Sequence, residues 1–368
     1  MNFDGSIIKK KAKENGYSVT ALAEKLHIAR QAVNTWMDGR VPRGKHLVDL
    51  CALLGLRPAD FFKAETKAPV TAPLHRAMKK KTLTPEMTEA SLATANEYLN
   101  IFRQAPASAM VQVVRVQERS VVAAKQTALR LRKISGIRDD KPMSYEGAFK
   151  LLDALNVFVV LRPFPKEITR DSYAFYSRIA DQRVVFVNID INVLDLIFQL
   201  LHETVHAVRD ESPEDIKTEA EESFCDKVAM FTQFPDFYVK TIATAISGCK
   251  PAQAVNLLKK FSGDNGHSLY GLYYRLREEG LFPETLSIGG AAANLNKEFP
   301  SLRDILYREP DPYRFVKVLF ELSPHFMKLV KANIPGVSVR KVGEWLGLDS
   351  TLDIKTVIDE INRRDDPA

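Results

Sequence analysis

Residues 194–209, LDLIFQLLHETVHAVR, decide how the rest of the chain is interpreted. Their apolar residues recur at steps of three and four, which predicts a helix with one apolar face. On such a helix His202 and His206 lie one turn apart on the same side, and Glu203 follows the first of them. This spacing brings two imidazole nitrogens within reach of one zinc ion and places a carboxylate beside it to accept a proton from water.

The setting of the motif favours a metal site over two ordinary histidines on a buried helix. An alternating apolar pattern at residues 183–188, RVVFVN, predicts a strand, and a short loop separates that strand from the helix. A lone histidine would favour simple packing. Two histidines at i and i+4 with a glutamate between them favour the metal site.

Length and composition limit the class of protein. The chain has 368 residues, of which 45% are hydrophobic, so we expect two or three domains with apolar cores. No run approaches eighteen uninterrupted apolar residues, and the first residues, MNFDGS, lack the layout of a signal peptide. These features predict a cytoplasmic protein without a membrane partner.

Cysteine usage and charge distribution add two further constraints. Cys51, Cys225 and Cys249 are an odd number at unrelated spacings, which indicates neither a disulfide framework nor a cysteine-rich zinc finger. The net charge of +6 is uneven, because residues 1–85 carry +9 and the remaining residues carry −3. The basic charge of residues 1–85 and the mildly acidic charge of the remaining residues predict that the N-terminal part contacts polyanions.

The basic N-terminal part contains the stretch SVTALAEKLHIARQAVNTWMDG at residues 18–39. Ser18 is a natural N-cap, and two short apolar-periodic segments follow it with a tight turn between them. The stretch resembles the XRE or lambda-repressor-like helix-turn-helix family, and the resemblance continues to Phe62. It implies a five-helix DNA-binding domain at residues 1–65. His27 replaces a glycine that is common at that turn in the family.

In this family the second helix of the helix-turn-helix motif enters the major groove of duplex DNA, and the resemblance implies the same here. Arginine and glutamine can bond guanine and adenine edges with two hydrogen bonds each, and other cations would contact phosphates. The alternative is a domain of this shape that contacts only protein. We expect DNA binding, as a homodimer on a two-part site, with Arg30, Gln31, Asn34 and Thr35 toward the bases and Arg40, Arg43 and Lys45 toward phosphates.

The middle of the chain predicts helices followed by a small sheet. Residues 66–85 are a basic linker by composition, and residues 86–104 and 111–134 have helical patterns. A helix at 144–155 and strands at 157–161, 172–179 and 184–188 then lead to the HETVH helix. This order resembles the ImmA/IrrE family of zincin-like metallopeptidases over residues 121–285.

The ImmA/IrrE resemblance implies a third ligand on the next helix. The family has a glutamate followed by an apolar residue, cysteine or alanine, and asparagine or aspartate, which this chain matches with ESFCD at residues 222–226. By that match Glu222 binds zinc and Asp226 orients a zinc-binding histidine. Geometry alone leaves Glu221 and Glu219 open as rivals. Cys225 is either a redox-sensitive thiol near the metal or a small core residue.

The segment SLYGLYYRLREEGL, residues 268–281, resembles the closing segment of the same family. A tyrosine or histidine there could stabilise an oxyanion, although packing is the simpler role for each. The candidates are His267, Tyr270, Tyr273 and Tyr274. Further helices are predicted at residues 313–361, with a pattern vaguely like a helix-turn-helix but without a basic face.

The sequence therefore predicts an α+β, mostly helical protein. Its parts are a five-helix lambda-repressor-like domain at 1–65, a basic linker at 66–85, a zincin-like domain with leading helices and a small sheet at 86–285, and a C-terminal helical region at 286–368. The predicted function is a DNA-binding regulator with zinc metalloendopeptidase activity and one Zn²⁺ per chain. The resemblance implies a narrow protein substrate, such as a DNA-bound helix-turn-helix repressor cut in a stress or phage response. The alternative is a repressor or antitoxin whose zinc domain is a non-catalytic sensor or scaffold.

Overall fold

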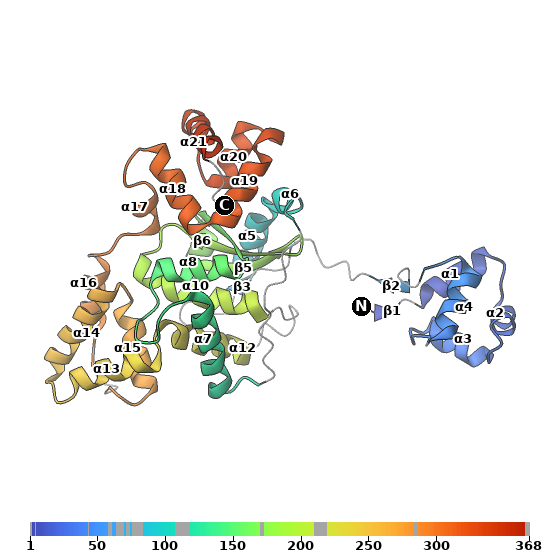
Figure 1. Cartoon of the computed structure of the whole chain (residues 1–368), viewed down its shortest axis with the longest axis horizontal. Helices are drawn as coiled ribbons and strands as arrows, with labels where there is room; N and C mark the ends of the chain where they lie inside the picture. The colour runs from blue at the N-terminus through green and yellow to red at the C-terminus, as the bar shows by residue number, and fades with distance from the viewer. Residues whose placement is uncertain are drawn as a thin grey trace. The chain divides into compact units, whose positions relative to one another are not determined.

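A computed structural model of the chain describes most of its residues, and they fall into two compact units, Met1–Ala68 and Pro69–Ala368 (Figure 1). The described residues are 2–3, 5–42, 44–57, 61–63, 70, 74–75, 84–106, 118–169, 173–209, 219–282 and 286–364. Each unit is considered by itself.

The first unit is a bundle of short helices closed by a small ribbon. Its elements are β1 (Asn2–Phe3), α1 (Ser6–Glu14), α2 (Val19–Lys25), α3 (Arg30–Met37), α4 (Lys45–Leu54) and β2 (Phe62–Lys63), and β1 pairs antiparallel with β2. The predicted cap forms, because the Ser18 hydroxyl accepts a hydrogen bond of 3.1 Å from the Ala21 amide. Four predicted helices are confirmed. The fifth predicted helix would have to lie between α4 and β2, and residues 58–60 of that segment lie outside the described part of the chain.

The turn between α2 and α3 keeps the geometry expected of a helix-turn-helix motif despite its histidine. His27 has φ of 53°, in the left-handed region that favours glycine. The core beneath this turn is well formed, with Leu22, Val33 and Trp36 all buried. The histidine therefore carries local backbone strain, which the packing of the two helices offsets.

The second unit contains a four-stranded sheet in the order β3-β5-β6-β4. The strands are β3 (Leu74–His75), β4 (Phe158–Arg162), β5 (Ala174–Ile179) and β6 (Gln182–Asn188). Strand β5 pairs antiparallel with β3 and β6, and β4 pairs parallel with β6. The three predicted strands are confirmed within one or two residues. Strand β3 was not predicted, because the composition of residues 66–85 indicated only a linker.

Helices cover both faces of this sheet. Figure 1 shows α8 (Tyr145–Ala154) and α10 (Val193–Arg209) on one side and α19 (Pro324–Asn333) on the other, and α10 contacts β5 and β6 whereas α19 contacts β4. Strand β6 is consequently buried at every position. The sheet and the helices around it share one hydrophobic core.

Helix α10 is buried more completely than its sequence pattern predicted. The spacing of its apolar residues indicated one apolar face, yet 15 of its 17 residues are buried. Helices α8 and α12 (Glu219–Gln233) and strands β5 and β6 pack around it. Its histidines and Glu203 are therefore buried polar groups that need polar partners.

Two groups of further helices complete the second unit. Between β3 and α8 lie α5 (Pro85–Asn96), α6 (Leu99–Phe102) and α7 (Val121–Ser135), so the predicted helix at 86–104 is divided at Glu97–Tyr98. The described residues after α12 form helices, and the helical region predicted at 286–368 is confirmed. They are α13 (Asp236–Ile246), α14 (Pro251–Asn265), α15 (Leu269–Glu278), α16 (Gly289–Asn296), α17 (Leu302–Leu306), α18 (Pro312–Leu322), α19, the 3-10 turn η2 (Ile334–Gly336), α20 (Val339–Leu346) and α21 (Thr351–Arg363).

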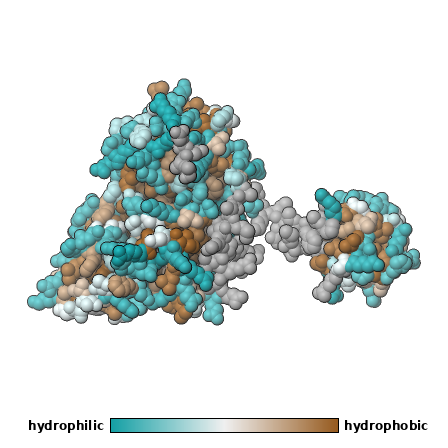
Figure 2. All heavy atoms as spheres, in the orientation of Figure 1, coloured by the Kyte–Doolittle hydropathy of each residue, from teal (hydrophilic) through white to brown (hydrophobic). Residues whose placement is uncertain are grey.

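The C-terminal helices belong to the same core as the sheet. The Tyr98 hydroxyl donates a hydrogen bond of 3.2 Å to the Trp345 carbonyl, and the Ser323 hydroxyl donates to the Val159 carbonyl. Mostly polar residues cover the faces visible in Figure 2. Among the described residues, no helix combines the length and apolar character needed to cross a membrane.

We predict that His267 makes the stability of the second unit depend on pH. Burial lowers the pKa of this histidine from its ordinary value to about 4, and its Nε2 lies 2.7 Å from the Tyr238 hydroxyl. The unfolded chain binds a proton more readily between pH 6.5 and 4, so protonation favours unfolding in that window. The free energy of unfolding should fall by up to about 3 kcal/mol as pH drops from 6.5 to 4.

Urea titrations of the wild type and of His267→Gln at pH 7 and pH 4.5 test this dependence. The variant should lose much less stability on acidification than the wild type, because its side chain does not titrate. Asn333→Ala, which alters another buried polar side chain, should shift stability equally at both pH values. An identical pH slope in wild type and His267→Gln would contradict the assignment.

Candidate metal centre and nucleic-acid interface

Helix α10 places two imidazole rings against each other in the interior of the second unit. His202 and His206 are one turn apart and almost completely buried, and their Nε2 atoms are 3.0 Å apart. A helix positions i and i+4 side chains on one face, which explains the close approach. The two nitrogens therefore point at a common position.

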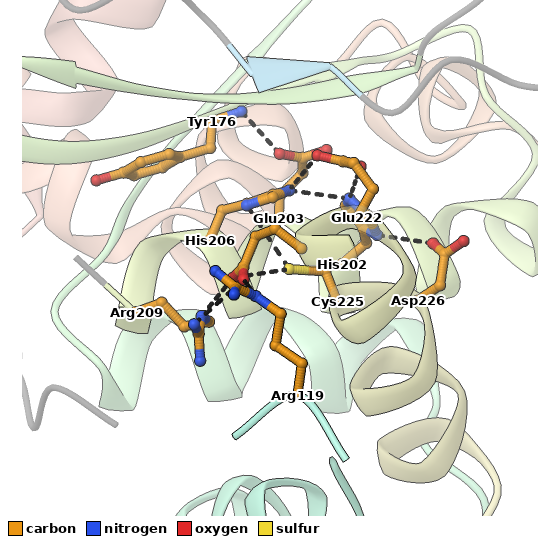
Figure 3. Close-up of polar contacts among 10 residues, drawn as sticks. Arg119, Tyr176, His202, Glu203, His206, Arg209, Glu222, Cys225 and Asp226 are labelled. Carbon is orange, nitrogen blue, oxygen red and sulfur yellow. Dashed lines mark hydrogen bonds and ion pairs between the residues drawn. The ribbon is translucent and has the colours of Figure 1, made fainter. Parts of the chain in front are cut away.

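Helix α12 brings a carboxylate to the same position (Figure 3). Glu222 Oε2 is 3.2 Å from His202 Nε2, and Glu222 Oε1 is 3.4 Å from His206 Nε2. In the described part of the chain these three residues form a group whose potential ligand atoms all lie within 4.8 Å of one another. Burial opposes ionisation, but hydrogen bonds to the two histidines hold the pKa of Glu222 well below its usual range.

Asp226 orients the first histidine. It lies one turn after Glu222 on α12, and its Oδ1 is 3.0 Å from His202 Nδ1. Burial disfavours the charged imidazole, but hydrogen bonds to Asp226 and Glu222 outweigh it and raise the pKa of His202 to about 9. Asp226 thus contacts the ring nitrogen that faces away from Glu222, and its role in orienting a zinc-bound histidine stays a prediction.

Glu203 lies beside this group but is held by the sheet. Its side chain is completely buried, and its Oε2 accepts a hydrogen bond of 2.9 Å from the backbone amide of Tyr176 on β5. The amide fixes one carboxylate oxygen next to the histidine pair (Figure 3). This role of Tyr176 was not predicted, since a backbone contact leaves no signal in the sequence.

The structure separates the rival glutamates that the sequence left open. Glu221 is buried and forms ion pairs with Arg209 of α10 and with Arg119, whose Nε lies 2.6 Å from Glu221 Oε2. Glu219, at the start of α12, is exposed. Neither arginine was predicted. Arg209 could have been noticed, because it lies three residues after His206 in the stretch that carries the motif.

Cys225 contacts the second histidine. Its Sγ lies 3.7 Å from His206 Nδ1 and 3.9 Å from Glu221 Oε1. Burial and the neighbouring carboxylates of Glu221 and Glu222 raise the pKa of this thiol well above its ordinary value. Burial also lowers the pKa of His206. The high pKa leaves the thiol protonated and weakly nucleophilic, which fits a small core residue.

The candidates for an oxyanion-stabilising residue have other contacts in the structure. His267 is buried against Phe234 and Tyr238. Tyr273 packs on Phe282, and the two remaining candidates, Tyr270 and Tyr274, stack on one another and are about half exposed. These contacts leave the oxyanion role of each candidate a prediction.

In the first unit α3 presents a polar surface suited to a nucleic acid. Its inward face is Val33 and Trp36, both buried, and its outward face carries the predicted base-contacting residues, all exposed: Arg30, Gln31, Asn34 and Thr35. The Thr35 hydroxyl donates a hydrogen bond of 2.8 Å to the Ala32 carbonyl. Of the predicted phosphate contacts, Arg40 and Lys45 are exposed, and Arg43 lies outside the described residues.

Comparison with known proteins identifies the first unit. Residues 8–67 match the family model of the Cro/C1-type helix-turn-helix DNA-binding domain. No curated protein and no solved structure matches the chain. The chain therefore carries a Cro/C1-type DNA-binding domain, which supports a role as a DNA-binding regulator.

The exposed face of α3 predicts how affinity for DNA responds to substitution. After selection of an operator from random duplexes, Gln31→Ala should cost about 1–3 kcal/mol and relax preference at one base position. Lys45→Ala should weaken binding to all sequences alike, because phosphate contacts carry no sequence information. Binding isotherms at several salt concentrations provide the measurement. An affinity that does not fall with salt would refute the interface, since phosphate neutralisation releases counterions.

Proposed function

We propose that this DNA-binding regulator is also a zinc-dependent metalloendopeptidase, with its catalytic centre between α10 and α12. The observation that carries the proposal is the convergence of His202, His206 and Glu222 on one position beside the buried carboxylate of Glu203. The resemblance of HETVH and ESFCD to the ImmA/IrrE metallopeptidases supports the same assignment.

The donor set suits zinc. Two imidazole nitrogens and one carboxylate oxygen are ligands that zinc accepts, and three protein ligands leave a coordination position for water or substrate, as in catalytic zinc sites. Asp226 Oδ1, 3.0 Å from His202 Nδ1, provides the outer carboxylate that holds a zinc-binding histidine in one tautomer. We therefore propose one Zn²⁺ per chain.

The groups at this centre have separate roles in peptide hydrolysis. A bound zinc ion supplies Lewis-acid chemistry, polarising the substrate carbonyl and making water more acidic. Glu203 accepts the proton that water loses as it attacks the peptide carbonyl, and then delivers that proton to the leaving amine. The amide of Tyr176 holds one oxygen of Glu203 in place, so the carboxylate keeps its orientation while it transfers the proton.

The two units together indicate the class of substrate. A sequence-reading domain joined to a peptidase would bring the peptidase to proteins bound near the same DNA, and tethering raises the local concentration of such a neighbour. We propose that the substrate is a regulatory protein, such as a DNA-bound helix-turn-helix repressor, cut in a stress or phage response.

Zinc content tests the ligand set. The purified chain should contain one zinc, and His202→Ala and Glu222→Ala should each lose most of it, since removal of a ligand leaves only two. Glu219→Ala is the matched control on the same helix and should keep its zinc, because Glu219 is exposed at the start of α12. Full zinc occupancy in Glu222→Ala would refute the proposed ligand set.

Proteolysis is tested separately from metal binding. Glu203→Gln should retain zinc and lose cleavage by at least about 100-fold, the lower range for loss of a general base. New N-termini in cells that express the wild type, Glu203→Gln or the control Glu219→Gln provide the measurement. Zinc-loaded wild type that generates no new termini relative to Glu203→Gln would favour a non-catalytic sensor or scaffold.

A further inference from the structure

We infer that the buried ion pair between Arg209 and Glu221 positions Glu222 for metal binding by fixing the rotation of α12 against α10. The inference rests on the proposed zinc site. It assigns a positioning role to two residues that are not zinc ligands, and it explains how the chain selects one of two adjacent glutamates.

The ion pair joins the two helices of the site directly. Arg209 is on α10, three residues after His206, and Glu221 precedes Glu222 on α12. The side chains of Arg209 and Glu221 are only 3% and 1% exposed. Both carboxylate oxygens of Glu221 are used, since Arg209 Nε pairs with Oε1 and an Arg209 terminal nitrogen donates to Oε2 at 3.2 Å.

Two contacts hold this pair in place. The Arg209 guanidinium lies over the ring of Phe224, 4.9 Å from its centre, so a residue of α12 also packs on the cation. Arg119, which precedes α7, donates to Glu221 Oε2 at 2.6 Å from the other end of the cluster. Figure 3 shows Arg119 and Arg209 approaching the same point from different segments.

Adjacent residues on a helix point roughly 100° apart, so Glu221 and Glu222 cannot both face the histidines. A buried arginine without a counter-charge is strongly unfavourable, and the same holds for a buried carboxylate. Any rotation of α12 that turned Glu221 toward the Nε2 atoms would separate it from Arg209. The ion pair with Arg209 on α10 therefore turns Glu221 away from the histidines. Glu222 is then the glutamate that faces the metal position.

Glu222 needs such support because its own side chain is less enclosed. It is 32% exposed, and it forms ion pairs with His202 and His206. Without the ion pair to Arg209, the polar contacts of α12 with α10 would be those of Asp226 with His202, of Cys225 with His206 and of Glu222 itself with the two histidines. A looser α12 would hold the third ligand less accurately, which weakens metal binding even when all three ligands are present.

The experiment compares Arg209→Met and Glu221→Gln with Arg275→Met in the full-length chain. Arg275 is the matched control, since it is another fully buried arginine that pairs with Asp236 and Glu279 away from the histidines. Zinc affinity is measured by competition with a chelator, the ligand field by the visible spectrum of the Co²⁺-loaded protein, and stability by unfolding of the metal-free chain.

Arg209→Met and Glu221→Gln should lower zinc affinity by about 10- to 100-fold and alter the Co²⁺ spectrum. Arg275→Met should lower stability but leave affinity and spectrum unchanged. Arg209→Lys, which keeps the charge, should recover part of the affinity, and it carries the test if Arg209→Met does not fold.

Wild-type affinity in both Arg209→Met and Glu221→Gln would overturn the inference and leave the proposed zinc site intact. Equal losses of affinity in Arg275→Met would also overturn it, because they would indicate general destabilisation. A wild-type chain that binds no zinc would overturn the proposed function, and the inference with it.

Discussion

The second unit depends on the burial of three ionisable side chains on one helix. His202, His206 and Glu203 lie in the interior of the protein, where polar groups without partners are costly. Each therefore has a partner from another element: α12 supplies Glu222, Cys225 and Asp226 to the histidines, and β5 supplies a backbone amide to Glu203. These contacts join α10 to α12 and to β5 within the shared apolar core.

This constraint also explains what the sequence could predict. The i, i+4 spacing of the histidines is local, so it identified one face of α10 without knowledge of the fold. The three predicted strands were found because apolar patterns and flanking turns are local as well. The choice between Glu221 and Glu222 depends on the rotation of α12 against α10, which local spacing does not define. The family resemblance selected Glu222, and the contacts of Arg209 with Glu221 give that choice a physical reason.

Other features were missed because their cause is not local. Strand β3 forms in a basic stretch whose composition indicated a linker, because the edge of β5 offers unpaired backbone groups to any neighbouring segment. The tyrosines and His267 suggested an oxyanion site by their position in the sequence. In the structure His267 is buried against Tyr238 of α13, Tyr273 packs on Phe282, and Tyr270 and Tyr274 stack on each other while about half exposed. In the first unit, by contrast, local signals located both helices, since the Ser18 cap and apolar spacing indicated α2 and apolar spacing indicated α3.

The most direct test of the proposed zinc centre is X-ray absorption at the zinc edge of the purified full-length chain. We predict about one zinc per chain with only nitrogen and oxygen neighbours at about 2.0–2.2 Å, including multiple-scattering features of two imidazoles. A sulfur neighbour at about 2.3 Å would contradict the account, because the proposed ligands are two histidines and a glutamate. Absence of zinc from a chain purified without chelators would contradict it as well.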